Sequence, residues 1–118
     1  MAKKILVVDD EELIRRVNIA LLSNSGYDVY EADGGESALA RMVDAENRPN
    51  LVITDITMPG MSGLELSKKI RDKYPDVKII ALSGLVHREE CGSYVDAYFS
   101  KPYDLTALRD KARELLGE

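Results

Sequence analysis

The feature that most constrains the fold of this chain is a regular alternation of short apolar runs with longer amphipathic stretches. Most of the runs are continuous and rich in β-branched residues, which is typical of strands buried on both faces of a sheet. One run, Tyr27–Ala32, alternates apolar and polar residues and is expected to be a half-exposed edge strand. The expected strands are Ile5–Val8, Tyr27–Ala32, Leu51–Ile53, Val77–Leu82 and Ala97–Phe99.

The amphipathic stretches between these runs repeat their apolar residues at helical spacing. Asp104 precedes the apolar residues of the last stretch and can serve as its N-cap. In the first stretch the apolar positions are Leu13, Ile14, Val17, Ala20 and Leu21. The expected helices are Glu12–Ser23, Gly34–Ala45, Leu64–Tyr74 and Asp104–Leu116.

A fourth helix is expected between the last two strands, but the pattern of its segment is weak. Leu85–Val95 contains Gly92 and Ser93 and has little apolar periodicity, so this helix should be short, irregular or partly absent. Five strand–helix units in strict alternation indicate a parallel sheet with helices on both faces, and the strand order 2-1-3-4-5 is common at this size. We therefore expect an α/β, flavodoxin-like (βα)5 fold, doubly wound around a parallel five-stranded sheet, with a shortened fourth helix. A single domain should cover residues 1–118.

Composition and charge disfavour several classes of protein. The single cysteine, Cys91, allows no internal disulfide, which fits a reducing cytoplasm. The net charge of −5 argues against nucleic-acid binding by this domain, because phosphate contacts need a basic patch. The N-terminal apolar run is too short for a signal peptide or a membrane span. We therefore expect a cytoplasmic domain that binds neither membranes nor nucleic acid directly.

Residues suited to metal or phosphate chemistry stand at the ends of four expected strands. Asp9 and Asp10 follow the first strand, Asp55 the third, Ser83 the fourth and Lys101 the fifth. Ligands of open parallel sheets bind beyond the carboxyl ends of the strands. In the order 2-1-3-4-5 these four strands are consecutive neighbours, so three carboxylates, a hydroxyl and an amine should converge on one edge of the sheet.

Such a convergence of carboxylates needs a cation to offset it. Two carboxylates about 4 Å apart repel each other by roughly 4 kcal/mol at an effective dielectric of 20. Lys101 supplies only one compensating charge. Oxygen ligands with open positions suit Mg²⁺, which favours sites shared with a phosphate. A carboxylate here could act as the nucleophile toward a phosphoryl group, with Mg²⁺ and the lysine stabilising the equatorial oxygens.

Four motifs of the sequence resemble those of the response regulator receiver family, the chemotaxis-type signalling domains of two-component systems. Each motif alone is weak, but the four occur in the right order and extend from one end of the chain to the other. They are Ile5–Glu11 (ILVVDDE), Asp55–Glu65 (DITMPGMSGLE), Ala81–Gly84 (ALSG) and Lys101–Tyr103 (KPY).

The resemblance implies a phosphoryl-acceptor site. Asp55 would be the phospho-acceptor, and the metal would be Mg²⁺. Its ligands would be Asp9, Asp10, Asp55 and the backbone carbonyl of Thr57. The phosphoryl donor would be a phosphohistidine on a sensor histidine kinase or a phosphotransfer protein. The chain itself would not turn over a separate substrate.

The resemblance also implies a conformational switch that signals to a downstream partner or an attached output domain. Lys101 would bind the phosphate, Ser83 would be the switch hydroxyl and Tyr98 the aromatic switch. The peptide bond between Lys101 and Pro102 would be cis. This sequence departs from the family because Ser83 and Lys101 are closer along the chain than usual, by about one helical turn, roughly 3.6 residues. The departure leaves the chemistry in place but puts the usual output surface in question.

Two alternative functions stay open. A phosphatase of the haloacid-dehalogenase type also uses an aspartyl phosphate and Mg²⁺, but it needs an Asp-x-Asp motif where this chain has adjacent aspartates. A receiver-like interaction module that works without phosphorylation is disfavoured because all five strand-end residues are retained. The chain could be a stand-alone regulator or part of a larger protein. The expected minor roles are a surface position for His87, none for Cys91, and loop backbone geometry for Gly63.

Overall fold

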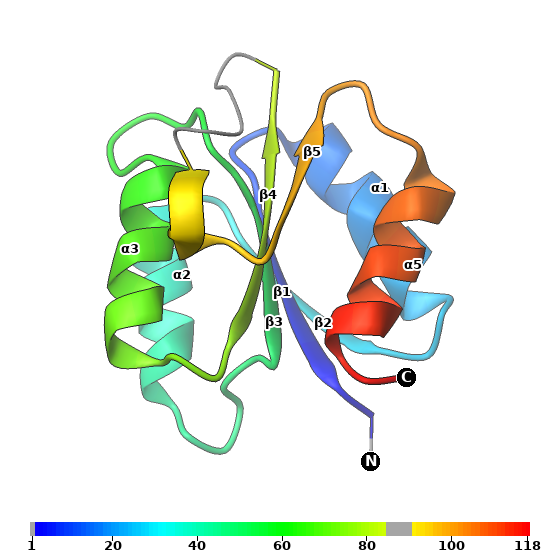
Figure 1. Ribbon diagram of the computed structural model, residues 1–118, viewed down its shortest axis with the longest axis horizontal. Helices are drawn as coiled ribbons and strands as arrows, with labels where there is room; N and C mark the ends of the chain where they lie inside the picture. The colour runs from blue at the N-terminus through cyan, green and yellow to red at the C-terminus, as the bar shows by residue number, and fades with distance from the viewer. Residues whose placement is uncertain (1, 85–90) are drawn as a thin grey trace.

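The computed structural model describes residues 2–84 and 91–118, and Figure 1 shows a central sheet between two layers of helices. The five strands are parallel and lie in the order β2-β1-β3-β4-β5, which confirms the predicted topology. β2 lies at one edge and is only partly buried, as its alternating sequence predicted. The strands are β1 (Lys4–Val8), β2 (Asp28–Ala32), β3 (Leu51–Asp55), β4 (Lys78–Ser83) and β5 (Ala97–Ser100).

In the described part of the chain, two α-helices cover each face of the sheet. α2 and α3 lie on one face, and α1 and α5 lie on the other (Figure 1). Asp104 caps α5 as predicted, because its Oδ1 accepts a hydrogen bond from the backbone N–H of Thr106 at 2.8 Å. The helices are α1 (Glu12–Ser23), α2 (Gly35–Val43), α3 (Gly63–Lys73) and α5 (Leu105–Leu115).

The segment expected to form a shortened fourth helix is described only in part. Residues 85–90 lie outside the described residues, so the predictions for this helix and for His87 are not addressed by the structure. The described remainder includes a 3-10 helix, η1 (Gly92–Tyr94), which leads into β5.

The core forms two apolar layers, one on each side of the sheet. Along β1, Ile5 and Val7 face the layer beneath α1 and α5, whereas Leu6 and Val8 face the layer beneath α2 and α3. All four side chains are buried, as expected for a strand covered on both faces. This burial fixes the directions of the strands and therefore the positions of the residues that follow them.

Some apolar residues at helical spacing lie on the surface instead of in the core. Leu13 and Val17 of α1 are 80% and 50% exposed, and Leu105 at the start of α5 is 40% exposed. Together with Ile14 and the loop after β5 they line an apolar groove of about 510 Å³. Within the described part of the chain, no helix combines the length and apolar character needed to cross a membrane.

Candidate functional site

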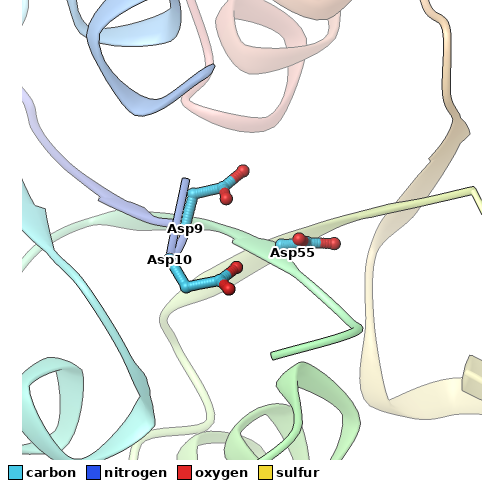
Figure 2. A group of neighbouring side chains, drawn as sticks. All are labelled: Asp9, Asp10 and Asp55. Atoms are coloured by element: carbon cyan, nitrogen blue, oxygen red, sulfur yellow. The ribbon is translucent and has the colours of Figure 1, made fainter. Parts of the chain in front are cut away.

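The carboxyl ends of β1 and β3 bring the three predicted aspartates together. Asp9 and Asp10 directly follow β1, and Asp55 is the last residue of β3, the neighbouring strand. Figure 2 shows the three carboxylates pointing to the same side of the strand ends. One ligand oxygen from each lies within 4.8 Å of the others. The predicted convergence of the carboxylates is therefore present.

Asp9 is the most constrained of the three. Its side chain is buried, and its Oδ1 accepts a hydrogen bond from the backbone N–H of Glu11 at 2.9 Å. Among the described residues nothing donates a hydrogen bond to its buried Oδ2. Burial raises the pKa of Asp9 above its usual value. The Glu11 amide and Lys101 oppose this rise, while the nearby carboxylates of Asp55 and Asp10 add to it.

Arg15 of α1 holds the main chain at the same strand end. Its Nη1 donates to the backbone carbonyl of Asp9 at 2.7 Å, and its Nε donates to the Glu31 carboxylate at 2.7 Å. Only 12% of the Arg15 side chain is exposed, so its bond to the Asp9 carbonyl is partly shielded from solvent, whereas its Glu31 partner is 54% exposed. This arginine was not singled out from the sequence, where it reads as one of two adjacent surface cations.

Lys101, the residue directly after β5, brings positive charge to the aspartates. Its Nζ lies 3.2 Å from Asp55 Oδ2 and 3.8 Å from Asp9 Oδ2. Its backbone N–H donates to the Ser83 carbonyl at 2.9 Å, which fixes the Lys101 backbone against the end of β4. Burial alone would lower the pKa of Lys101, but the Asp55 and Asp9 carboxylates outweigh burial and raise the pKa above its usual value. The Lys101–Pro102 peptide bond is cis, as the family resemblance implied.

Ser83 lies on β4, the strand next to β3, and Tyr98 lies on β5, one strand further out. Ser83 is the last residue of β4 and is completely buried. Tyr98 lies opposite Ala81 in β5 and packs, half-buried, against a small apolar cluster of Ile56, Ala81 and Cys91. Thr57 lies two residues beyond β3 and is exposed.

Gly63 has a different role from the one expected. It is the first residue of α3, and it is not among the glycines with a positive φ. A Cβ at this position would overlap the backbone carbonyl oxygen of Asp55 and lie 2.8 Å from Ile56 Cα. Its N–H also donates to the Ile56 carbonyl at 2.8 Å. Glycine is therefore needed because α3 approaches the end of β3 closely, not because the loop requires an unusual dihedral angle.

A second arrangement that the sequence did not reveal is a part-buried polar pair between α1 and the loop after β5. Asn18 is only 1% exposed, and its Nδ2 donates to the Tyr103 hydroxyl at 2.9 Å. The one available sequence signal is a lone polar residue between the apolar Val17 and Ile19. That signal cannot identify the partner, which lies 85 residues further along the chain.

The carboxylate cluster suits a hard divalent cation. Its donors are all oxygens, and the buried Asp9 Oδ2 lacks a hydrogen bond from the described residues. Among residues 2–84 and 91–118, the one lysine within 4 Å leaves an excess of negative charge on the three aspartates. Mg²⁺ prefers such oxygen ligands and retains several waters, so the residues fit the metal that the family resemblance implied.

Comparison with known sequences identifies the family. Residues 5–113 match the family model of the response regulator receiver domain. Sporulation initiation phosphotransferase F of Bacillus subtilis (strain 168) is 30% identical over 122 residues, which cover 98% of this chain and 95% of that protein. Several other curated relatives are longer, and the chain spans 12% to 52% of their length.

Solved structures agree with the sequence comparison. The receiver domain protein from Methanospirillum hungatei JF-1 has a TM-score of 0.92 and 31% identity, with 99% of this chain and 95% of that chain covered. The response regulator TrrA from Thermotoga maritima, in complex with Mg(2+)-BeF, has a TM-score of 0.88 and 40% identity, with 96% and 98% covered. The fold, the carboxylate site and these similarities lead to one assignment. The chain belongs to the response regulator receiver domain family of two-component signalling systems.

Proposed function

We propose that this receiver accepts a phosphoryl group on Asp55 in a Mg²⁺-dependent reaction. The observation that carries the proposal is the buried Asp55 carboxylate, which has Lys101 Nζ at 3.2 Å and two further aspartates within reach of the same cation. A carboxylate oxygen of Asp55 would attack the phosphorus of a phosphohistidine. The new O–P bond forms an acyl phosphate as the P–N bond breaks, and the electron pair of that bond returns to the imidazole.

Asp9, Asp10, Asp55 and the Thr57 carbonyl would hold the Mg²⁺. The support is the chemistry of the donors and the buried Asp9 Oδ2, which lacks a hydrogen bond from the described residues. When bound, the metal supplies positive charge that offsets the charge on the transferred oxygens. The structure of TrrA in complex with Mg(2+)-BeF adds support from a similar protein.

Lys101 and Ser83 would bind the oxygens of the transferred group. Lys101 is favoured because its ammonium already lies beside Asp55, and Ser83 because it ends the strand next to β3. Movement of the Ser83 hydroxyl toward the phosphoryl group would be accompanied by a change in the position of Tyr98. The half-buried packing of Tyr98 against Ile56 and Ala81 is compatible with such a change. The resulting surface would signal to a downstream partner or an attached output domain.

The phosphoryl donor would be a sensor histidine kinase or a phosphotransfer protein. It must approach the carboxyl edge of the sheet, where the exposed Leu13 and Val17 of α1 lie in one groove with Lys101 and Leu105. An apolar surface beside a charged site suits a protein partner, because exposed apolar patches commonly mark protein interfaces.

We also propose that residues 1–118 form one cytoplasmic receiver domain that turns over no separate substrate. Its net charge of −5 supports the view that this domain does not itself bind nucleic acid.

The test is intact-mass analysis after incubation with Mg²⁺ and acetyl phosphate. We expect one added phosphoryl group on the wild-type chain and none after EDTA treatment or in Asp55→Ala. Asp33→Asn is the matched control, because Asp33 also follows a strand but is an exposed residue outside the carboxylate cluster. The proposal fails if the wild type gains no adduct or if the adduct persists in Asp55→Ala. The first of these results, with Mg²⁺ bound normally, would favour an interaction module that works without phosphorylation.

A further inference from the structure

We propose that Asn18 and Tyr103 form a positioning pair that holds the Lys101 ammonium at the acceptor site. This inference rests on the function proposed above and adds two residues to the machinery of the same site. Neither residue touches the reacting atoms. They would act through Lys101, which lies two positions before Tyr103 in the chain.

The contact between the two side chains is reciprocal. Asn18 Nδ2 donates to the Tyr103 hydroxyl at 2.9 Å, and this hydroxyl lies 3.2 Å from Asn18 Oδ1, to which it donates in turn. Asn18 is 1% exposed, so it has no access to water as an alternative partner. The ring of Tyr103 packs at a tilt against Phe99, with 6.3 Å between the ring centroids. The Tyr103 side chain is therefore held at two points, because α1 bonds its hydroxyl and its ring packs against Phe99.

The pair fixes the middle of a short loop whose ends are fixed by other contacts. Before it, the Lys101 N–H is bonded to the Ser83 carbonyl at 2.9 Å. After it, Asp104 caps α5 by accepting from the Thr106 N–H at 2.8 Å. Tyr103 ties the segment between these two points to α1. The direction in which the Lys101 side chain leaves the loop depends on this tie, because the backbone at residues 101–103 sets that direction.

The same helix also holds the opposite side of the site. Arg15, which lies one helical turn before Asn18, donates to the Asp9 carbonyl at 2.7 Å. Thus α1 is bonded to the strand end that carries Asp9 and to the loop that carries Lys101. The 3.8 Å separation of Lys101 Nζ from Asp9 Oδ2 spans the gap between these two anchored segments. A helix bonded to both segments fixes the distance between the ammonium and the carboxylates.

Phosphoryl transfer depends on the distance between the Lys101 ammonium and the carboxylates. Catalysis of the step comes almost entirely from positioning and from charge placed on the equatorial oxygens. A displacement of about 1 Å, even when it originates away from the reacting atoms, can slow a reaction by as much as about 100-fold. In Tyr103→Phe the buried Asn18 amide loses its partner, and the loop or helix must shift to give it another. We therefore expect phosphorylation by acetyl phosphate to slow by about tenfold, within that range.

The experiment compares four variants with the wild type by two measurements. The variants are Tyr103→Phe, Asn18→Leu, the double variant, and the control Tyr27→Phe. Tyr27 is also buried, and burial and the nearby Glu118 carboxylate raise the pKa of its hydroxyl, but it lies just before β2, at the opposite end of the strands. The first measurement is the rate of phosphorylation by acetyl phosphate with saturating Mg²⁺. The second is the ¹⁹F spectrum of the beryllofluoride adduct, whose fluorines take the places of the phosphoryl oxygens beside Lys101.

Three outcomes support the inference together. Both single variants slow by a similar factor, the double variant is no slower than either, and their ¹⁹F signals shift while those of Tyr27→Phe match the wild type. Equal rates in the two single variants and the double variant are expected because all three remove the same interaction. A matched loss in Tyr27→Phe would assign the effect to lower overall stability and overturn the inference.

The remaining outcomes separate this inference from the proposed function. If the wild type is phosphorylated and binds beryllofluoride, but Tyr103→Phe and Asn18→Leu behave identically to it, only the positioning role is lost. If the wild type forms neither adduct, the acceptor function and the positioning role both fall.

Discussion

Replacing Asp9 with asparagine is expected to stabilise the metal-free protein at neutral pH and to remove its stabilisation by Mg²⁺. Asp9 is buried, and one of its oxygens has no hydrogen-bond donor among the described residues, so its ionised form is poorly solvated. Asparagine has nearly the same shape and keeps an acceptor for the Glu11 N–H. The substitution therefore removes a charge with little change in packing.

The magnitude follows from the charges around Asp9. The carboxylate oxygens of Asp9 and Asp55 lie within 4.8 Å of each other, which corresponds to a repulsion of about 3.5 kcal/mol at an effective dielectric of 20. Lys101 Nζ, 3.8 Å from Asp9 Oδ2, contributes an attraction of about 4.4 kcal/mol at the same effective dielectric. These two contributions nearly cancel, so burial and the repulsion from Asp10 decide the sign. We expect a net gain of about 1 kcal/mol in Asp9→Asn, in the lower part of the range for a buried polar group without a hydrogen-bond partner.

The raised pKa also fixes the direction of the pH dependence. Asp9 binds its proton more tightly in the folded chain than in the unfolded chain, whose carboxyl has the ordinary value of 3.8. The wild type therefore loses stability relative to Asp9→Asn as the pH rises from 3.8 through the higher folded pKa. Below this window both side chains are neutral and the difference should disappear.

Urea unfolding of both proteins in EDTA between about pH 4 and pH 7 measures this difference. The same titration with Mg²⁺ at about 100 times its Kd should stabilise the wild type by about 2.7 kcal/mol and leave Asp9→Asn unchanged. Asp33→Asn, an exposed strand-end control, should follow the wild type in both conditions. A less stable Asp9→Asn protein in EDTA, or equal stabilisation of both proteins by Mg²⁺, would refute the reasoning.

Two further substitutions test how the site and the segment before β5 are held. Gly63→Ala should lower the free energy of unfolding by about 2 kcal/mol in urea titration, because the Cβ of the alanine would overlap the Asp55 carbonyl. Gly34→Ala is the control and should cost less, because a Cβ there would have no atom within 4 Å. Equal losses in the two variants would contradict this account. Arg71→Met should lower the free energy of unfolding by about 2 kcal/mol, because Arg71 bonds Asp96 at 2.7 Å and the carbonyls of Pro75, Val77 and Tyr94. Arg16→Met is the control. It should cost under about 0.5 kcal/mol, because Arg16 pairs with Glu12 on the exposed surface. Similar unfolding midpoints for Arg71→Met and Arg16→Met would show that the Arg71 contacts add nothing.

The fold could be predicted from the sequence because its signals are local. Each expected strand begins or ends within two residues of the observed one, and the burial of Ile5–Val8 on both faces follows directly from its continuous apolar sequence. The strand order placed Asp9, Asp10, Asp55, Ser83 and Lys101 at one edge, and that is where they lie.

The contacts that support the site could not be predicted in the same way, because they depend on distances between elements far apart in sequence. Apolar periodicity placed the exposed Leu13 among the apolar positions of this helix and left out the buried Leu22, since the choice depends on how α1 lies on the sheet. Gly63 stands in a turn-rich motif, and only the approach of α3 to β3 reveals why a side chain is excluded there. Asn18 reads as an ordinary helix residue until Tyr103 is placed beside it.

The contacts of α1 explain how a site with unbalanced charge keeps its geometry. Without a metal, the repulsion among the three carboxylates tends to separate the strand ends that carry them. Three groups on or next to α1 resist this: the Glu11 N–H bonds the Asp9 carboxylate, Arg15 bonds its carbonyl, and Asn18 bonds the loop of Lys101. The first of these lies at the N-terminus of the helix, where the backbone dipole also favours a negative charge. Because these groups lie on α1 or on the residue directly before it, the helix holds both the Asp9 strand end and the Lys101 loop, and under the proposed function a bound cation would not need to reorganise them.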